Sequence, residues 1–76
     1  FTIATNGNRG SFTVKSETLT FSSISVFDIS GKRVQTIKPV HEFENSIDLS
    51  TVVNGVYFLR LEESNGTIYH SKIVVN

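Results

Sequence analysis

Residues 47–61 have the sequence IDLSTVVNGVYFLRL and decide the fold of this chain. Ile47 and Leu49 alternate with polar residues, which is typical of a strand with one buried face, and a longer alternating run follows. Between the two runs we expect one tight corner about one helical turn long. In this corner, the Ser50 side chain is expected to accept hydrogen bonds from backbone N–H groups. Asn54-Gly55 is expected to supply backbone with positive φ where the chain turns back.

Tyr57 starts the second run, two residues after Gly55. Its ring is expected to pack inward while its hydroxyl reaches back to a backbone carbonyl of the corner. This arrangement, the tyrosine corner, is typical of immunoglobulin-like sandwiches. We therefore interpret Asp48, Asn54, Gly55 and Tyr57, together with Gly31 in another turn, as residues that serve the fold.

The rest of the chain reads as short strands separated by turns. The seven runs that predict strands are residues 1–4, 11–15, 19–29, 33–38, 47–50, 56–61 and 67–75. Turn residues fall between them at intervals of roughly 8–12 residues, and no stretch has helical periodicity. The sequence thus predicts an all-β fold, an immunoglobulin-like β-sandwich of about seven short antiparallel strands, with residues 1–76 as a single domain.

Several details of this sandwich stay open or carry specific expectations. The first two runs either pair as a hairpin or lie in different sheets. Residues 19–29 have apolar groups on both faces, as a central strand covered on each side requires. Val34 and Ile37 are three apart, so either a bulge redirects one of them or Ile37 faces outward. Residues 40–45 read as a loop that holds Phe43, and Asn65-Gly66 predicts the last hairpin.

Composition limits the function. The 76 residues include seven basic and seven acidic side chains and no cysteine. The charges are scattered, which argues against nucleic acid or a membrane surface as partner, since both require clustered Lys and Arg. No apolar run approaches the roughly 18 residues of a membrane span. Because the chain opens on Phe1 without an initiator Met, we interpret it as a piece of a longer protein.

Candidate chemical groups are few. His41, His70, Asp28 and Asp48 are the side chains that would pair with a serine in nucleophilic catalysis, but no motif spacing marks them. The histidines are far apart and there is no acidic calcium loop, so no metal site and no cofactor are expected. The loop at residues 6–10 offers amide oxygens, although a plain turn explains it better. The sequence predicts that the chain is not an enzyme.

Two further surface features have ordinary explanations. Asn65-Gly66-Thr67 matches the N-glycosylation pattern, but the hairpin requires Asn-Gly in any case. Phe43 and Phe58 are candidates for a sugar-binding platform, although packing is the better explanation.

Four segments carry a resemblance to a known family. They are SVFDISGKRV at residues 25–34, IDLS at 47–50, NGVYFLR at 54–60 and KIVV at 72–75. In order and spacing they resemble the C-terminal sorting domain, type A, of the type IX secretion system, over nearly all of the chain. The family commonly opens with Asn-Pro-x-x-Gly-x-Phe. Residues 6–12 are NGNRGSF, with Gly7 in place of the proline, so the turn is expected to persist with a looser entry.

The resemblance implies a domain that follows a cargo domain in the same chain, in bacteria of the Bacteroidetes type. Such a domain is recognised by the outer-membrane secretion machinery, and a sortase-like protease often removes it and can attach the cargo to lipopolysaccharide. The expected location is secreted or at the cell surface. Recognition is expected at outward-facing terminal residues, namely Lys72, Ile73, Val74, Val75 and Asn76.

A different class of function is the alternative. An immunoglobulin- or fibronectin-like accessory module of a secreted enzyme or adhesin, acting as a spacer or binding sugar, would have the same fold. A small nucleic-acid-binding barrel is disfavoured by the net charge of zero.

Overall fold

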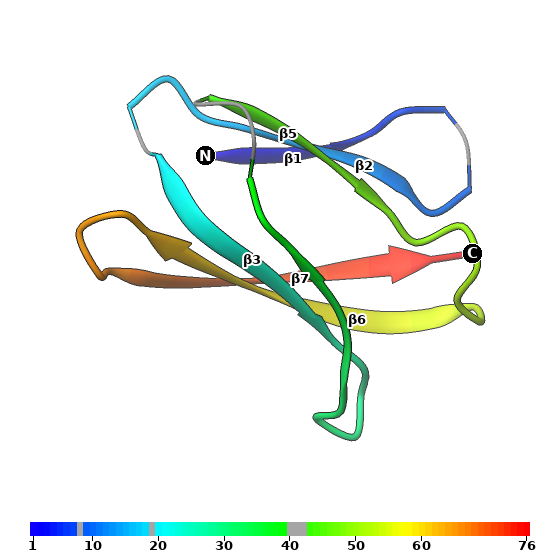
Figure 1. Ribbon diagram of the computed structural model, residues 1–76. Helices are drawn as coiled ribbons and strands as arrows, with labels where there is room; N and C mark the ends of the chain where they lie inside the picture. Colours follow the sequence, from blue (N-terminus) through cyan, green and yellow to red (C-terminus); the bar gives the residue numbers. More distant parts are fainter. Residues whose placement is uncertain (8, 19, 40–42) are drawn as a thin grey trace.

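The computed structural model describes residues 1–7, 9–18, 20–39 and 43–76 (Figure 1). These residues form seven β-strands in two layers that pack face to face (Figure 1). The strands are β1 (Thr2–Thr5), β2 (Ser11–Lys15), β3 (Phe21–Phe27), β4 (Arg33–Ile37), β5 (Glu44–Asp48), β6 (Gly55–Glu63) and β7 (Ile68–Val75). All pairings are antiparallel.

The strand order is that of an immunoglobulin-like sandwich. Within the described part of the chain, one sheet has the order β1-β2-β5 and the other has the order β4-β3-β6-β7. In immunoglobulin lettering these are the sheets ABE and C′CFG, and the connection from β5 to β6 is the E–F corner. The predicted all-β sandwich of antiparallel strands is confirmed.

The first two strands form a hairpin, which settles the question that the sequence left open. Ile3 lies opposite Val14 in the pairing of β1 with β2. On the other side of β2, Phe12 lies opposite Ile47 of β5, and both side chains are buried. The alternation in both strands therefore places one face of this sheet against the core.

Two irregularities shift the apolar pattern in the second sheet. The pairing of β3 with β4 shifts between Val26 and Phe27, leaving Val34 as the extra residue of β4. As a result, Ile37 lies opposite Ile24 and packs against the core, whereas Val34 is exposed. The bulge that was one of the two predicted alternatives is thus confirmed.

The expectation that residues 19–29 form a strand with apolar cover on both faces is wrong. Position 19 lies outside the described residues, and β3 ends at Phe27, so Ile29 falls in the following turn and is 81% exposed. The outward positions of β3 are Ser23, Ser25 and Phe27, so this face is polar at two of its three positions, although Ser25 is buried and Phe27 is half-buried. A two-layer sandwich buries only one face of each sheet, so β3 lies between β4 and β6 without being covered on both sides.

The expected loop at residues 40–45 is also corrected. Residues 40–42, and with them His41, lie outside the described residues, while Glu44 and Asn45 already belong to β5. Strand β5 ends at Asp48, and Leu49 follows it with a fully buried side chain. The apolar alternation located this strand but placed both of its limits too late in the chain. The polar residues at its start carry no periodic signal, and the buried Leu49 continues the alternation beyond its end.

The final hairpin has the predicted turn. Gly66 N–H donates to the Glu63 carbonyl at 2.8 Å, and Thr67 N–H donates to Asn65 Oδ1 at 2.9 Å. The Asn65 side chain is therefore part of the turn itself. This supports the hairpin explanation of the Asn-Gly-Thr triplet.

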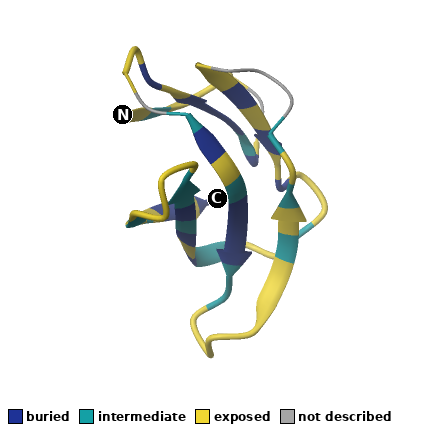
Figure 2. Ribbon diagram, turned by 60° about the vertical axis from the view of Figure 1, so that its left-hand side comes forward, coloured by how far each residue is buried: buried dark blue, intermediate teal, exposed yellow. Residues whose placement is uncertain are grey.

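The core lies between the two sheets, where the buried segments of both layers meet (Figure 2). Its fully buried members with the largest side chains are Ile24, Ile47, Leu49, Leu59, Leu61, Val14, Val26 and Val75. The described residues contain no helix that is long and apolar enough to cross a lipid bilayer.

Candidate functional site

The predicted recognition residues lie on β7 or directly after it. Among the described strands, β7 is the last of the four-stranded sheet and pairs only with β6 (Figure 1). Lys72 and Val74 are exposed, Val74 to 50%, and Asn76 is exposed as well. Ile73 and Val75 keep only 6% and 1% of their surface exposed.

The expectation that all five terminal residues face outward is therefore wrong for Ile73 and Val75. Successive side chains of a strand point to opposite faces, so every second residue of β7 joins the core. Ile73 lies opposite Tyr57 of β6, which is also buried. The outward group is thus reduced to Lys72, Val74 and Asn76, and the two buried residues hold β7 in place.

Tyr57 makes the predicted hydroxyl contact. Its hydroxyl donates a hydrogen bond of 2.6 Å to the Val53 carbonyl, four residues upstream, and the residue is 4% exposed. This is the geometry of a tyrosine corner at the start of the F strand. Because the bond joins the start of β6 to the corner, it fixes the direction in which β6 enters the sheet beside β7.

The rest of the corner differs in detail from the sequence-based expectation. Asp48 Oδ1, rather than the Ser50 side chain, accepts from a backbone N–H, that of Ser50, at 2.9 Å. The corner is a turn closed by Val52 N–H to the Leu49 carbonyl at 3.3 Å, not a full helical turn. Hydrogen bonds from the Ser50 side chain and backbone lower the pKa of Asp48 below its usual value of 3.8.

Gly55 has a φ of 158°, which is close to extended backbone, and none of the described non-glycine residues, Asn54 included, has positive φ. Asn54 instead serves the corner through its side chain. Its Oδ1 accepts from Arg9 Nε at 2.9 Å and from Nη2 at 2.6 Å.

Arg9 binds the corner from the hairpin between β1 and β2, and sequence reasoning missed it. Besides its bonds to Asn54, the guanidinium donates to the Ser50 carbonyl at 2.8 Å and to the Val52 carbonyl at 2.6 Å. The planar fork of an arginine suits several acceptors held in one plane. No local sequence signal reveals this contact, because its partners lie more than forty residues away.

Gly10, next to Arg9, brings the same hairpin loop directly onto the corner. It is buried with a φ of 75°, and its carbonyl accepts from Leu49 N–H at 2.7 Å. A Cβ at this position would lie 2.6 Å from the Leu49 carbonyl carbon and oxygen. The glycine of the sequence NGNRGSF is thus required by close backbone approach as well as by its φ.

Gly31 lies in the turn between β3 and β4, with a φ of 88°. The turn is organised by Asp28, whose Oδ1 accepts from Ser30 N–H at 2.9 Å, from Ser30 Oγ at 2.6 Å and from Lys32 N–H at 3.0 Å. The Ser30 side chain, followed by the Lys32 backbone, lowers the pKa of this carboxyl below 3.8. Asp28 therefore serves the turn.

Of the side chains considered for catalysis, the three that the structure describes, His70, Asp28 and Asp48, are not assembled into one site. His70 is exposed on β7, opposite Arg60 of β6, whereas Asp28 and Asp48 are each bound within their own turns in different sheets. In the loop considered for calcium, the Asn6 side-chain oxygen already accepts from the Thr13 hydroxyl. Among the described residues, no group of three or more metal-binding side chains is found.

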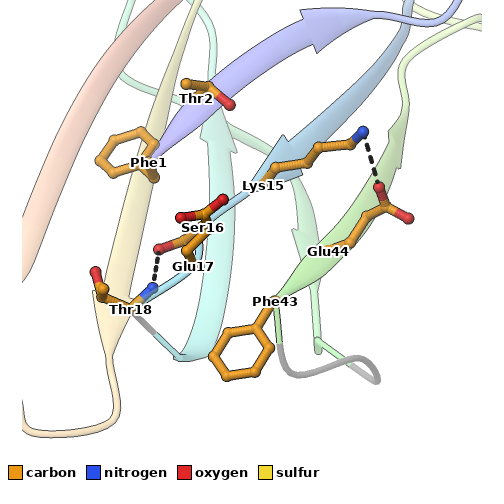
Figure 3. A pocket seen from close by; sticks show the side chains of 8 residues that line it. All are labelled: Phe1, Thr2, Lys15, Ser16, Glu17, Thr18, Phe43 and Glu44. Atoms are coloured by element: carbon orange, nitrogen blue, oxygen red, sulfur yellow. Dashed lines mark hydrogen bonds and ion pairs between the residues drawn. The ribbon is translucent and has the colours of Figure 1, made fainter.

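A cleft lies at the end of the sandwich where β1 begins (Figure 3). Its volume is about 650 Å³, and its lining residues are Phe1, Thr2, Lys15, Ser16, Glu17, Thr18, Phe43 and Glu44. Lys15 and Glu44 point toward each other and form an exposed ion pair of 3.2 Å (Figure 3). Phe43 lines this cleft, whereas Phe58 lies on β6 of the other sheet, so the two rings do not form one sugar-binding platform.

The comparisons with known proteins identify the family. A model of the family described as secretion system C-terminal sorting domain matches residues 5–76. Among curated proteins, no sequence matches this chain. Members of this family are non-enzymatic signals that interact with the type IX secretion machinery and lead to export across the outer membrane. The chain therefore belongs to the family of secretion system C-terminal sorting domains and directs the secretion of a cargo protein through the type IX secretion system.

Proposed function

We propose that the exposed terminal residues Lys72, Val74 and Asn76 are the part of this sorting domain that the outer-membrane secretion machinery reads. The supporting observation is the position of β7 at the end of the four-stranded sheet, with alternate residues presented outward. An edge strand offers both side chains and free backbone groups to a partner, so recognition by strand addition is available there as well.

The same proposal covers the finer points of the pathway. Residues 1–76 act as one sorting domain that follows the cargo in the same chain. A sortase-like protease removes the domain, and the cargo then stays at the cell surface or is released. These steps are supported by the family to which the chain belongs, and each is testable by following the size and location of a reporter.

The structure changes how the proposal must be tested. Deleting residues 72–76 removes two buried core residues, Ile73 and Val75, and therefore confounds recognition with unfolding. A sharper test replaces only the exposed residues in the triple variant Lys72→Ser, Val74→Ser, Asn76→Ser. The variant is fused behind a reporter in a bacterium that has a type IX secretion system.

We expect the triple variant to accumulate inside the cell while the purified domain keeps its melting temperature. The matched control is Lys15→Ser with Glu44→Ser, two exposed residues of the other sheet whose ion pair contributes little. The control should be secreted normally. Normal secretion of the triple variant would end the proposal that the terminal residues are read.

A further inference from the structure

The outward face of the four-stranded sheet carries a row of two cations and two aromatic rings. Arg33 of β4 lies opposite Phe27 of β3, Phe27 lies opposite Phe58 of β6, and Phe58 lies opposite Lys72 of β7. We name these four residues the basic-aromatic row. They cross the whole described sheet from one edge to the other, with the rings in the middle.

The row is open to solvent. Phe58 keeps 39% of its surface exposed, Arg33 and Lys72 are exposed, and Phe27 is half-buried. Val74 lies beside the row and is 50% exposed. Apolar side chains gathered on one sheet face and bordered by charged residues are typical of a surface that contacts a protein partner.

The charge of this face differs from that of the whole chain. Besides Arg33 and Lys72, the next outward row contains Arg60, which lies opposite His70. The described carboxylate on this face is Glu62, at 3.8 Å from the Arg60 guanidinium. The face therefore has three cations against one carboxylate, whereas the whole chain has a formal net charge of zero.

We propose that this face docks on a protein surface of the secretion machinery that has an apolar centre surrounded by carboxylates. The inference rests on the proposed function and extends it from the terminal strand to the whole sheet. Opposite charges around an apolar contact fix its register and raise the rate of encounter. An anionic lipid surface fits less well, because lipid binding of this kind requires clusters of about four to eight cations.

The size of the face suits a reversible contact. The four strands lie about 4.8 Å apart, so the face is roughly 14 Å wide across the strands. Its outward rows extend over about six residues along each strand, which gives a length of roughly 20 Å. This area is smaller than the roughly 800 Å² per partner of a standard stable interface. A transient interface of this size lets the machinery release the domain after recognition.

If the whole face is recognised, and not the terminal residues alone, residues on other strands must also affect secretion. Arg33 lies at the opposite edge of the sheet from Lys72 and is brought into the same row only by folding. Recognition therefore depends on residues far from the terminal segment. A variant at Arg33 tests this directly, because the hydrogen bond of its side chain within the described part of the chain is a long one, 3.5 Å to Thr36.

The experiment uses the full 76-residue chain behind a reporter, in a bacterium with a type IX secretion system. Arg33→Glu and Lys72→Glu are compared with Lys15→Glu, an equal charge reversal on the other sheet. Each of the first two variants is expected to lower the secreted fraction by roughly tenfold, because each places a carboxylate opposite the carboxylates of the partner, and like charges across an interface are costly. The control is expected to stay within about twofold.

Melting temperatures of the purified chains establish that the variants are folded. If Arg33→Glu melts below the unmodified chain, then Arg33→Gln, which removes the charge without reversing it, replaces it in the assay. Unchanged secretion of the Arg33 variant overturns the inference. It leaves the proposed function intact if the triple β7 variant is still retained in the cell, whereas normal secretion of that triple variant overturns both.

The lipid alternative is tested on the same chains. Purified chain is sedimented with vesicles of phosphatidylserine and phosphatidylcholine, and the expected result is no binding. If the unmodified chain sediments with the vesicles and Arg33→Glu does not, the face binds a lipid surface, and the proposal of a protein partner is overturned.

Discussion

The hydroxyl of Tyr57 is a single polar group that joins two parts of the sandwich. Its ring occupies the core opposite Ile73, and its oxygen reaches the Val53 carbonyl at 2.6 Å. The side chain thus satisfies a corner carbonyl while burying an aromatic ring, a combination that phenylalanine cannot provide.

For Tyr57→Phe we expect the free energy of unfolding to fall by about 1 kcal/mol or somewhat more, because the Val53 carbonyl loses its part-buried hydrogen bond from the Tyr57 hydroxyl. Urea denaturation of both chains measures the change. The second tyrosine provides a control: Tyr69 is only partly buried, so Tyr69→Phe should have a smaller effect. Equal stability of Tyr57→Phe and the unmodified chain would show that the 2.6 Å bond contributes nothing.

Single residues also show where sequence reasoning succeeds. The position of Tyr57 two residues after Gly55 was sufficient to predict its contact, since the partner is four residues away. Arg9 was not predictable in the same way, because its acceptors are brought to it by the whole fold. The corner acceptor was assigned to Ser50 instead of Asp48 because both residue types accept from nearby backbone N–H groups.

At the scale of elements, the hairpin loop between β1 and β2 is fitted to the corner by Gly10. Its backbone approach to Leu49 leaves no room for a side chain. Gly7 lies in the same loop with a similar φ of 85°, but a Cβ there would meet nothing within 4 Å. Alanine substitutions at the two glycines therefore separate two contributions to the loss of stability: the strain of positive φ, which both share, and the contact with Leu49, which only Gly10 has.

We expect Gly10→Ala to lower the free energy of unfolding by clearly more than about 1 kcal/mol, because the strained φ and the contact with Leu49 add. Gly7→Ala should show only the part due to φ. Thermal unfolding of the two variants measures the difference. Indistinguishable melting temperatures would mean that the loop shifts away from the corner at no cost.

The turn elements make stability depend on pH. In the folded chain, the pKa values of Asp28 and Asp48 are lowered from 3.8 by hydrogen bonds within their turns. Their stabilising contribution is therefore fully present above the unfolded pKa and is lost as the pH falls through the lowered folded pKa.

We expect the free energy of unfolding of the unmodified chain to be flat from pH 7 to about pH 5 and to decrease below that value. The double variant Asp28→Asn, Asp48→Asn should be less stable at pH 7 and should lose less stability on acidification. Urea denaturation at a series of pH values measures both curves. Parallel curves would show that these two carboxyls are not responsible for the acid dependence.

Among the elements, alternation predicted the existence and the inward faces of β2, β6 and β7, and the central part of β5. The limits of the strands and the bulges were less predictable. Ile29 was assigned to a strand because it continues an apolar run, yet the Asp28 turn ends β3 before it. The bulge at Val34 was one of two alternatives, since the spacing of Val34 and Ile37 fits either. Choosing between them requires the pairing partner, which a single strand does not specify.

On the scale of the whole molecule, β7 contributes to the core and to the surface at once. Ile73 is almost fully buried, and its neighbour Val74 is half exposed. Core packing and the proposed recognition therefore fall on adjacent residues of the same strand, because successive side chains of a strand point to opposite faces. Their separate roles can be tested by two conservative truncations.

We expect Ile73→Ala to lower the free energy of unfolding by about 2–4 kcal/mol, the usual cost of a large-to-small change in a core. Val74→Ala should change it by less than about 0.5 kcal/mol. Urea denaturation compares the two variants directly. A large loss of stability in Val74→Ala would show that the outward face is covered within the domain itself, and the proposed docking surface would then be unavailable.

Because β7 has one buried and one exposed face, its loss from an incompletely synthesised chain would affect both folding and export. Translation that stops before Lys72 yields a chain that lacks both the outward residues and the inward residues Ile73 and Val75 that hold β7 in place. A cargo protein made in this way would lack the proposed recognition residues, and its sorting domain would lack a stable fold. Export would then be restricted to molecules whose synthesis has passed this strand.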